Sequence, residues 1–92
     1  MNRVERIRSA LQAAFTPQLV EVRDDSHRHA GHAGASDGRG HFKVIVVSEA
    51  FAGKAPLARH RAVYAALGDM METDIYALSI KALTPQEQRA PG

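Results

Sequence analysis

Hydrophobic residues at the start of the chain recur three or four positions apart, which is helical spacing. We therefore expect a helix over residues 2–15, capped at its start by Asn2 and Glu5 and ended by Pro17. The apolar side chains that would share one side of this helix are Val4, Ile7, Leu11 and Phe15.

Two strands separated by a long loop are predicted next. Residues 19–24 ("LVEVRD") alternate weakly and are rich in β-branched side chains, whereas residues 25–40 ("DSHRHAGHAGASDGRG") lack periodicity, as loops do. Residues 41–48 ("HFKVIVVS") are apolar on both faces of a strand, so this strand should be central. We expect residues 42–47 to be the backbone best protected from hydrogen exchange and the 25–40 loop to exchange fast.

The second half of the chain is predicted to hold a turn, a helix and a third strand. "EAFAGK" gives a short turn or helix broken at Gly53, and Pro56 suits the first turn of the helix that follows. An acidic linker around residues 69–74 then precedes a strand over 75–83 and a short helix over 84–89. The stripe expected along the helix that begins at Pro56 is Leu57, His60, Tyr64 and Leu67.

This order of elements, α-β-β-α-α-β-α, predicts a two-layer α+β domain. The first two strands would form a hairpin with a long loop. The helical pair would then cross over to a third strand that is parallel to the second, giving a three-stranded mixed sheet with helices on one face. We expect residues 1–92 to form one such domain, because 92 residues with 45% hydrophobic content suffice for one modest core.

Composition narrows the possible chemistry. The chain has no cysteine, so it can supply neither a disulfide nor a thiolate ligand, and any iron–sulfur chemistry would take its thiolates from a partner. The net charge of +2 with a pI near 9.4 is mild evidence for an acidic partner. The charged first segment and the short apolar run "VIVV" predict neither a secretory signal nor a membrane span, so we expect a cytoplasmic protein.

The sequence resembles the BolA family over nearly its whole length. The resemblance rests on "DDSHRHAGH", on "HFKVIVVSEAFAGKAPLARHRAVYAAL" and on "ALSIKALTPQE", and its most specific part is the central block with Ser48, Phe51, Gly53 and "RHR" at residues 59–61. Membership would imply a class II K-homology-like fold, in which the Gly53 turn stands where a K-homology domain keeps its GxxG loop. Here the turn reads "GKAP" and lacks the second glycine.

The segment "KAPLARHR" is the first candidate site. Lys54, Arg59 and Arg61 have no acidic neighbour within it, and a helix N-terminus adds positive charge that suits a phosphate. The resemblance associates this region with DNA binding and transcriptional control. The alternative is a solvated basic face of the helix.

The loop "HRHAGH" is the second candidate. His27, His29 and His32 have spacings compatible with imidazole ligation of a metal. The resemblance implies pairing with a monothiol glutaredoxin through a shared 2Fe–2S cluster, to which the BolA partner gives a loop residue and a histidine near the start of the last strand. His29 best matches the loop position. The alternative is a polar loop without a ligand role, because ordering such a loop around a metal costs free energy.

Position 76 departs from the family pattern. The last strand usually begins Ile-His-Ala-Leu, whereas here it reads "IYAL", so Tyr76 stands where the resemblance places the second ligand. A phenol with an ordinary pKa near ~10 is a poor ligand at neutral pH, although a coordinated tyrosinate is chemically possible. The other interpretation of Tyr76 is a half-buried strand aromatic.

No catalytic constellation is predicted. Asp25, Ser26 and His27 are consecutive in a loop, and the carboxylates of Asp24 and Asp25 point apart on extended chain, so neither set lines up for catalysis. We therefore expect no catalysis. What the resemblance implies is a regulatory protein that acts by binding a monothiol glutaredoxin, in iron–sulfur and iron homeostasis and stress response, and by binding duplex DNA.

The alternative is an accessory interaction module with neither metal nor DNA. The isolated chain should hold no cofactor and be a monomer or a weak homodimer.

Overall fold

The computed structural model describes residues 1–26 and 38–90. Its elements in chain order are α1 (Arg3–Phe15), β1 (Leu19–Asp24), β2 (Gly40–Val47), the 3₁₀ helix η3 (Glu49–Phe51), α2 (Pro56–Leu67), α3 (Met70–Thr73), β3 (Ile75–Leu83) and α4 (Pro85–Arg89).

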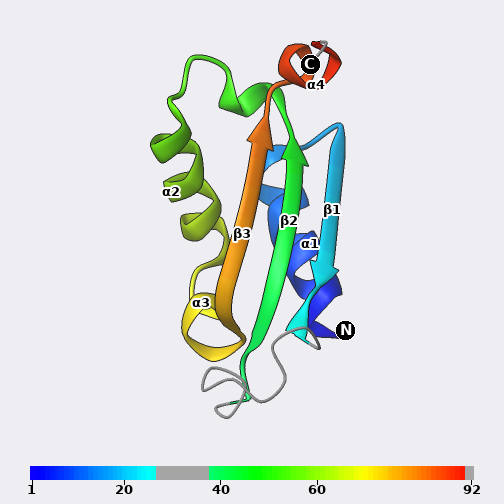
Figure 1. Cartoon of the computed structure of the whole chain (residues 1–92), viewed down its shortest axis with the longest axis vertical. Coiled ribbons are helices and arrows are strands. Elements are labelled where there is room, and N and C mark those ends of the chain that lie inside the picture. The colour runs from blue at the N-terminus through cyan, green and yellow to red at the C-terminus, as the bar shows by residue number, and fades with distance from the viewer. Residues whose placement is uncertain (27–37, 91–92) are drawn as a thin grey trace.

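The three strands form one mixed sheet in the order β1-β2-β3 (Figure 1). β1 pairs antiparallel with β2, with Glu21 opposite Ile45. β3 pairs parallel with β2, with Lys81 beside Ile45, and a register irregularity falls between Gly40 and His41. This arrangement confirms the predicted α+β fold, including the central position of β2.

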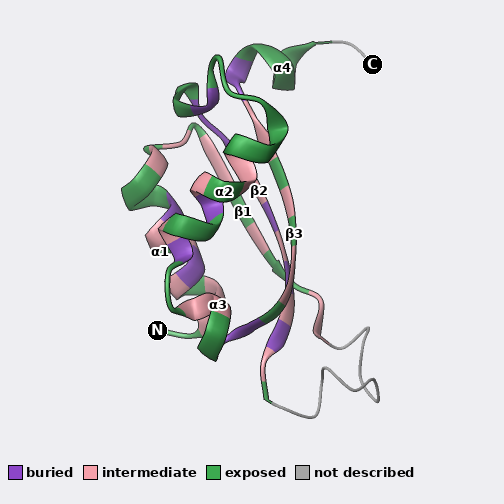
Figure 2. Cartoon of the chain, turned by 90° about the vertical axis from the view of Figure 1, so that its left-hand side faces the viewer, coloured by how far each residue is buried: buried purple, intermediate pink, exposed green. Residues whose placement is uncertain are grey.

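The helices α1, α2 and α3 cover one face of the sheet, and α4 lies at the end of the sheet where β2 and β3 finish (Figure 2). The burial pattern of β2 reflects this layering, because successive side chains of a strand point to opposite faces. Phe42, Val44 and Val46 are buried on the face that the helices cover, whereas His41, Lys43 and Ile45 on the other face are only half-buried. The core that forms between the sheet and the helices consists of Ile7, Leu11, Phe42, Val44, Val46, Phe51, Val63, Leu67 and Ile75.

The first helix follows its sequence pattern closely. The side chain of Asn2 accepts a hydrogen bond from the backbone N–H of Glu5, at 2.8 Å, as an N-cap does. Of the predicted apolar stripe, Ile7 and Leu11 are buried, and Val4 and Phe15 pack against the core from its edge. The helix therefore contributes an almost continuous apolar stripe to the core.

The stripe predicted for α2 was confirmed at Leu67 and wrong at Leu57 and Tyr64. Leu57 and Tyr64 are 61% and 41% exposed, whereas Val63 and Leu67 are buried. The physical reason is that alanines lie on several sides of this helix, so its apolar residues do not single out one stripe. A second correction concerns the acidic linker, part of which forms the single helical turn α3.

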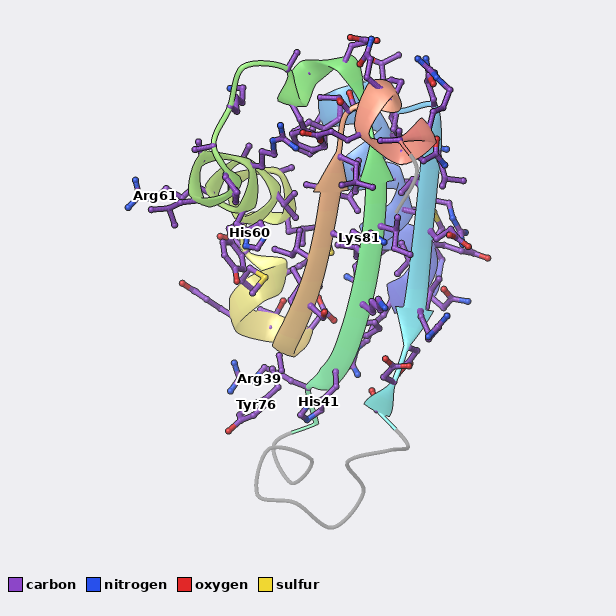
Figure 3. The ribbon with its side chains drawn as sticks, turned by 45° about the horizontal axis from the view of Figure 1, so that its top comes forward. Arg39, His41, His60, Arg61, Tyr76 and Lys81 are labelled. Carbon is purple, nitrogen blue, oxygen red and sulfur yellow. The ribbon has the colours of Figure 1, made fainter. Side chains whose placement is uncertain are left out.

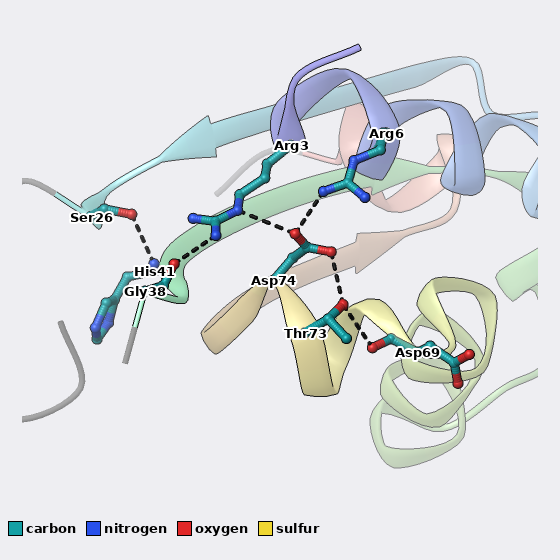
Figure 4. A network of polar contacts seen from close by, with 8 residues as sticks. All are labelled: Arg3, Arg6, Ser26, Gly38, His41, Asp69, Thr73 and Asp74. Carbon is teal, nitrogen blue, oxygen red and sulfur yellow. Dashed lines mark hydrogen bonds and ion pairs between the residues drawn. The ribbon is translucent and has the colours of Figure 1, made fainter. Parts of the chain in front are cut away.

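Asp74 anchors the end of the sheet from which β3 starts (Figure 4). Its carboxylate accepts hydrogen bonds from the guanidinium groups of Arg6, at 2.6 Å, and Arg3, at 3.2 Å. Thr73 donates a third, at 2.9 Å. Because both arginines belong to α1, the network ties that helix to the start of β3.

Within the described residues, no helix combines the length and the apolarity that crossing a bilayer requires.

Candidate functional site

Three local features form the turn between β2 and α2. The hydroxyl of Ser48 donates to the Phe15 carbonyl, at 2.7 Å, and accepts from the Ala50 N–H, which caps η3. Gly53 has a φ of +76°, a left-handed conformation that glycine adopts without strain. α2 then begins at Pro56 behind Ala55, whose side chain cannot cap the helix. No side chain therefore caps the first N–H groups of α2, and uncapped N–H groups are what an anion site needs.

Arg59 makes contacts that a reading along the chain does not reveal. Its guanidinium pairs with both carboxylate oxygens of Glu87, at 2.6 and 3.1 Å, and donates to the carbonyls of Lys54 and Ala82. Only 11% of its side chain is exposed. The segment around Arg59 lacks an acidic neighbour in sequence, but α4 supplies one in space.

The pairing shifts the pKa values of both partners. The hydrogen bond to Glu87 raises the pKa of the Arg59 guanidinium. The same bond, with help from the Thr84 N–H, lowers the pKa of Glu87 to about 2. The contacts of Arg59 therefore hold α2, β3 and α4 together, and its charge is already matched by a carboxylate.

Lys54 and Arg61 remain exposed. Arg61 extends outward from α2 (Figure 3), and none of the ion pairs within residues 1–26 and 38–90 involves it or Lys54. Of the three cations predicted to contact nucleic acid, these two are positioned to meet a ligand.

A second group of side chains gathers where β2 and β3 begin. The ring of Tyr76 lies 5.3 Å from that of His41, between centroids, and the guanidinium of Arg39 lies 5.1 Å from the Tyr76 centroid. Figure 3 shows the three side chains at this end of the sheet. We call Arg39, His41 and Tyr76 the loop-end cluster. It contains an imidazole from the central strand directly beside position 76.

The network of Asp74 fixes the chain that carries this cluster (Figure 4). The N–H of Gly40 donates to the Asp74 carbonyl, at 2.9 Å. Arg3, which binds the Asp74 carboxylate, also donates to the Gly38 carbonyl, at 2.6 Å. Ser26 accepts from the His41 N–H, at 3.0 Å. Three hydrogen bonds thus hold the backbone of residues 38–41, which carries the side chain of His41.

The contact between His41 and Tyr76 is what sequence reasoning missed here. The parallel pairing of β2 with β3, which was predicted, brings the starts of the two strands together although His41 and Tyr76 are 35 positions apart in sequence. An available signal was the expected parallel pairing itself, which places the first residues of both strands at one end of the sheet.

The predicted loop ligands His27, His29 and His32 lie outside the described residues. Within the described part of the chain, no three His, Cys, Asp or Glu side chains are grouped as a metal site would need. An open hollow of about 230 Å³ beside the loop-end cluster is lined by Asp25, His41, Phe42, Ala77, Leu78 and Ser79.

Comparison with known proteins identifies relatives over most of the chain. The family model for BolA-like proteins matches residues 11–87. The "DNA-binding transcriptional regulator BolA" of Escherichia coli is 42% identical over 83 residues, which are 90% of this chain and 76% of that protein. "SufE-like protein 1, chloroplastic/mitochondrial" of Arabidopsis thaliana is 43% identical over 94% of this chain but only 24% of that protein, so this relative is far longer.

Solved structures agree with these matches. The BolA domain of SufE1 from Arabidopsis thaliana superposes with a TM-score of 0.83 and 42% identity, covering 95% of this chain and 96% of that one. BolA1 from the same plant gives a TM-score of 0.81 at 35% identity over 99% of both chains. The likeness to K-homology domains stays a prediction. Because both the family model and relatives above 40% identity span most of its residues, the chain belongs to the BolA-like protein family.

Proposed function

We propose that this chain is a DNA-binding regulator that contacts duplex DNA with the start of α2. The E. coli relative is named a DNA-binding transcriptional regulator and shares 42% identity over 90% of this chain. The observation that carries the proposal is the exposed start of α2, where the first turn holds no acidic residue and Ala55 provides no side-chain cap. Lys54 and Arg61 add two exposed positive charges to it.

The structure changes the expected strength of this contact. With Arg59 paired to Glu87, two side-chain cations remain for phosphate instead of three. The affinity for a random-sequence duplex should therefore fall with log salt at a slope of about −2, since each phosphate contact contributes about −0.9. Binding of this kind is weak and positions the protein without reading sequence.

Fluorescence anisotropy on a labelled duplex across a salt series tests the proposal. The double variant Lys54→Ala/Arg61→Ala should bind several-fold more weakly and with a flatter salt slope. The matched control, Lys43→Ala/Lys81→Ala, removes the same charge from the sheet and should leave both quantities unchanged. An unchanged slope in a folded Lys54→Ala/Arg61→Ala protein would show that the start of α2 does not contact DNA.

A second function, partnership with a monothiol glutaredoxin in iron homeostasis, is favoured by the loop-end cluster. Residues 38–41 are fixed beside position 76, which is where the resemblance places a ligand to a shared 2Fe–2S cluster. The described residues do not fit the implied ligand pair, however, because position 76 holds a phenol whose ring packs against Arg39 and His41. We propose that a glutaredoxin docks here without a long-lived shared cluster.

The alternative function is that of an accessory module, which docks a protein partner and binds neither DNA nor metal. It predicts no salt-dependent duplex binding and a colourless complex with a glutaredoxin. We also propose that the protein acts in the cytoplasm and that it acts by binding, without catalysis. The names of the Arabidopsis relatives place those proteins in chloroplasts or mitochondria.

A further inference from the structure

The sheet has a second face that α1, α2 and α3 do not cover (Figure 2). The strand register assigns its residues to rows that run across the sheet. One row is Glu21–Ile45–Lys81, the next is Arg23–Lys43–Ser79, and the last is His41–Ala77. We call these three rows the open face. The row beyond them, Leu19–Val47–Leu83, lies at the α4 end of the sheet, and its central residue Val47 is buried.

The open face is basic and has an aliphatic centre. Arg23, Lys43 and Lys81 surround the half-buried Ile45, and Glu21 is the one carboxylate in the three rows. Among the described residues, none of the three cations takes part in an ion pair. A hollow of about 330 Å³ between β1 and β2 is lined by Glu21, Val22, Arg23, Asp24, Lys43 and Ile45. The Asp24 carboxylate there already accepts from the Ser26 N–H.

Fold stability does not account for this arrangement. Arg23 and Lys43 are directly opposite on antiparallel strands, where like charges repel. A face that carries uncompensated cations around an aliphatic side chain fits an interface with a polar rim and an apolar centre.

We propose that the open face docks an acidic amphipathic helix of a partner protein. Its apolar stripe would cover Ile45, and its carboxylates would meet Lys43 and Lys81. Helices are the elements that cover sheet faces, as α1 and α2 do on the opposite side. Three rows spaced two residues apart span about 13 Å of strand from first to last, which corresponds to about nine residues of helix. So small a contact gives a weak, transient complex.

Two other occupants fit less well. Single-stranded nucleic acid binds sheet faces by stacking on several aromatic rings, and the three rows hold no Phe, Tyr or Trp. Their one aromatic side chain, His41, lies in the last row, where its ring packs against Tyr76. A second copy of the chain in a two-fold dimer would bring the cations of one open face against those of the other. An acidic helix is the partner that satisfies both the aliphatic centre and the surrounding charge.

The experiment is an NMR titration of the ¹⁵N-labelled full chain with a lactam-bridged helical peptide of about 14 residues. The peptide carries leucines along one stripe and glutamates beside it. Amide shifts should centre on residues 43, 45, 79 and 81. Lys43→Gln/Lys81→Gln should weaken binding about five-fold, the product of two exposed ion pairs. Lys54→Gln/Arg61→Gln should leave the peptide affinity unchanged, which separates this inference from the proposed DNA contact.

Three results would overturn the inference. Equal binding of a peptide with lysines in place of its glutamates would remove the charge argument. Displacement of the acidic peptide by a single-stranded oligonucleotide that shifts the same amides would assign the face to nucleic acid. Shifts at these amides that grow with protein concentration, in the absence of peptide, would assign it to self-association.

Discussion

At the scale of single residues, Tyr76 is the clearest departure from the pattern of its family. It is 47% exposed, yet its ring contacts Arg39, which directly precedes β2, and His41 within β2. A cation–π contact and a ring contact of this kind stabilise modestly. Tyr76 therefore has a structural role, holding residues 39–41 beside β3, at the position where the resemblance implies an iron ligand.

The first prediction concerns the substitution of Tyr76 by histidine. Tyr76→His places a second imidazole next to His41, both on strands that the Asp74 network holds still. A complex of this variant with a monothiol glutaredoxin should keep its visible cluster absorption longer than the natural complex, because a preorganised ligand lowers the ordering cost. His29→Ala in the same background should reverse the gain.

Tyr76→Phe is the matched control, since it keeps the ring and removes only the phenol oxygen. It should behave as the natural protein does. A natural complex whose cluster is as long-lived as that of Tyr76→His, and whose cluster is lost in Tyr76→Phe, would show that a tyrosinate already serves as the ligand.

At the scale of elements, Arg59 links α2 to α4. Glu87 accepts from the Thr84 N–H in the capping box of α4 and from Arg59 at the same time. One carboxylate thus both starts a helix and holds it against another. The short α4 depends on this tie, because a helix of five residues is not stable by propensity alone.

The second prediction compares two neighbouring arginines of α2. Arg59→Ala should destabilise the chain by about 2 kcal/mol, because it removes charge-assisted hydrogen bonds and leaves the Ala82 carbonyl without its donor. Arg61→Ala, which removes an exposed side chain from the same helix, should change stability little. Urea unfolding measures both, and hydrogen exchange should show α4 opening more often in Arg59→Ala. Equal stabilities of the two variants would contradict the tie.

The strand β2 and the helix α2 show how far the sequence can predict the fold. The apolar run over residues 42–47 predicted the central strand correctly, and the alternation at Phe42, Val44 and Val46 marks its buried face, because such a face repeats every second residue. The stripe of α2 was predicted correctly only at Leu67, because the alanines of this helix leave the choice of face to tertiary packing. The function of Arg59 was missed because its partner Glu87 lies 28 positions away. Local patterns do not show such pairs.

At the scale of the whole molecule, two ionic ties hold opposite ends of the sheet (Figure 1). Arg3 and Arg6 bind Asp74 where β3 starts, and Arg59 binds Glu87 where β3 ends. The candidate sites lie near these ends, with the loop-end cluster at one and the start of α2 toward the other. Both ties depend on ionised carboxylates, so acid should loosen both ends of the domain.

The last prediction is the resulting dependence of stability on pH. Burial opposes the ionisation of Asp74, but hydrogen bonds from Arg6, Thr73 and Arg3 outweigh it and lower its pKa. Glu87, at about 2, lies well below its ordinary pKa of 4.5. A carboxylate whose pKa is lower in the folded state stabilises the fold above its unfolded pKa and loses that contribution as the pH falls through the folded value.

Urea unfolding should therefore show nearly constant stability from pH 7 to about pH 5 and a progressive loss toward about pH 2, with the carboxylates protonating over that range. Asp74→Asn and Glu87→Gln should each be less stable than the natural chain at pH 7, and the differences should shrink at low pH, where the natural carboxylates are protonated too. The open-face variant Glu21→Gln controls for the loss of one negative charge, since Glu21 takes part in none of the ion pairs of the described residues. If Asp74→Asn and Glu87→Gln follow the pH profile of the natural chain at a constant offset, the acid sensitivity arises elsewhere and the two ties do not set it.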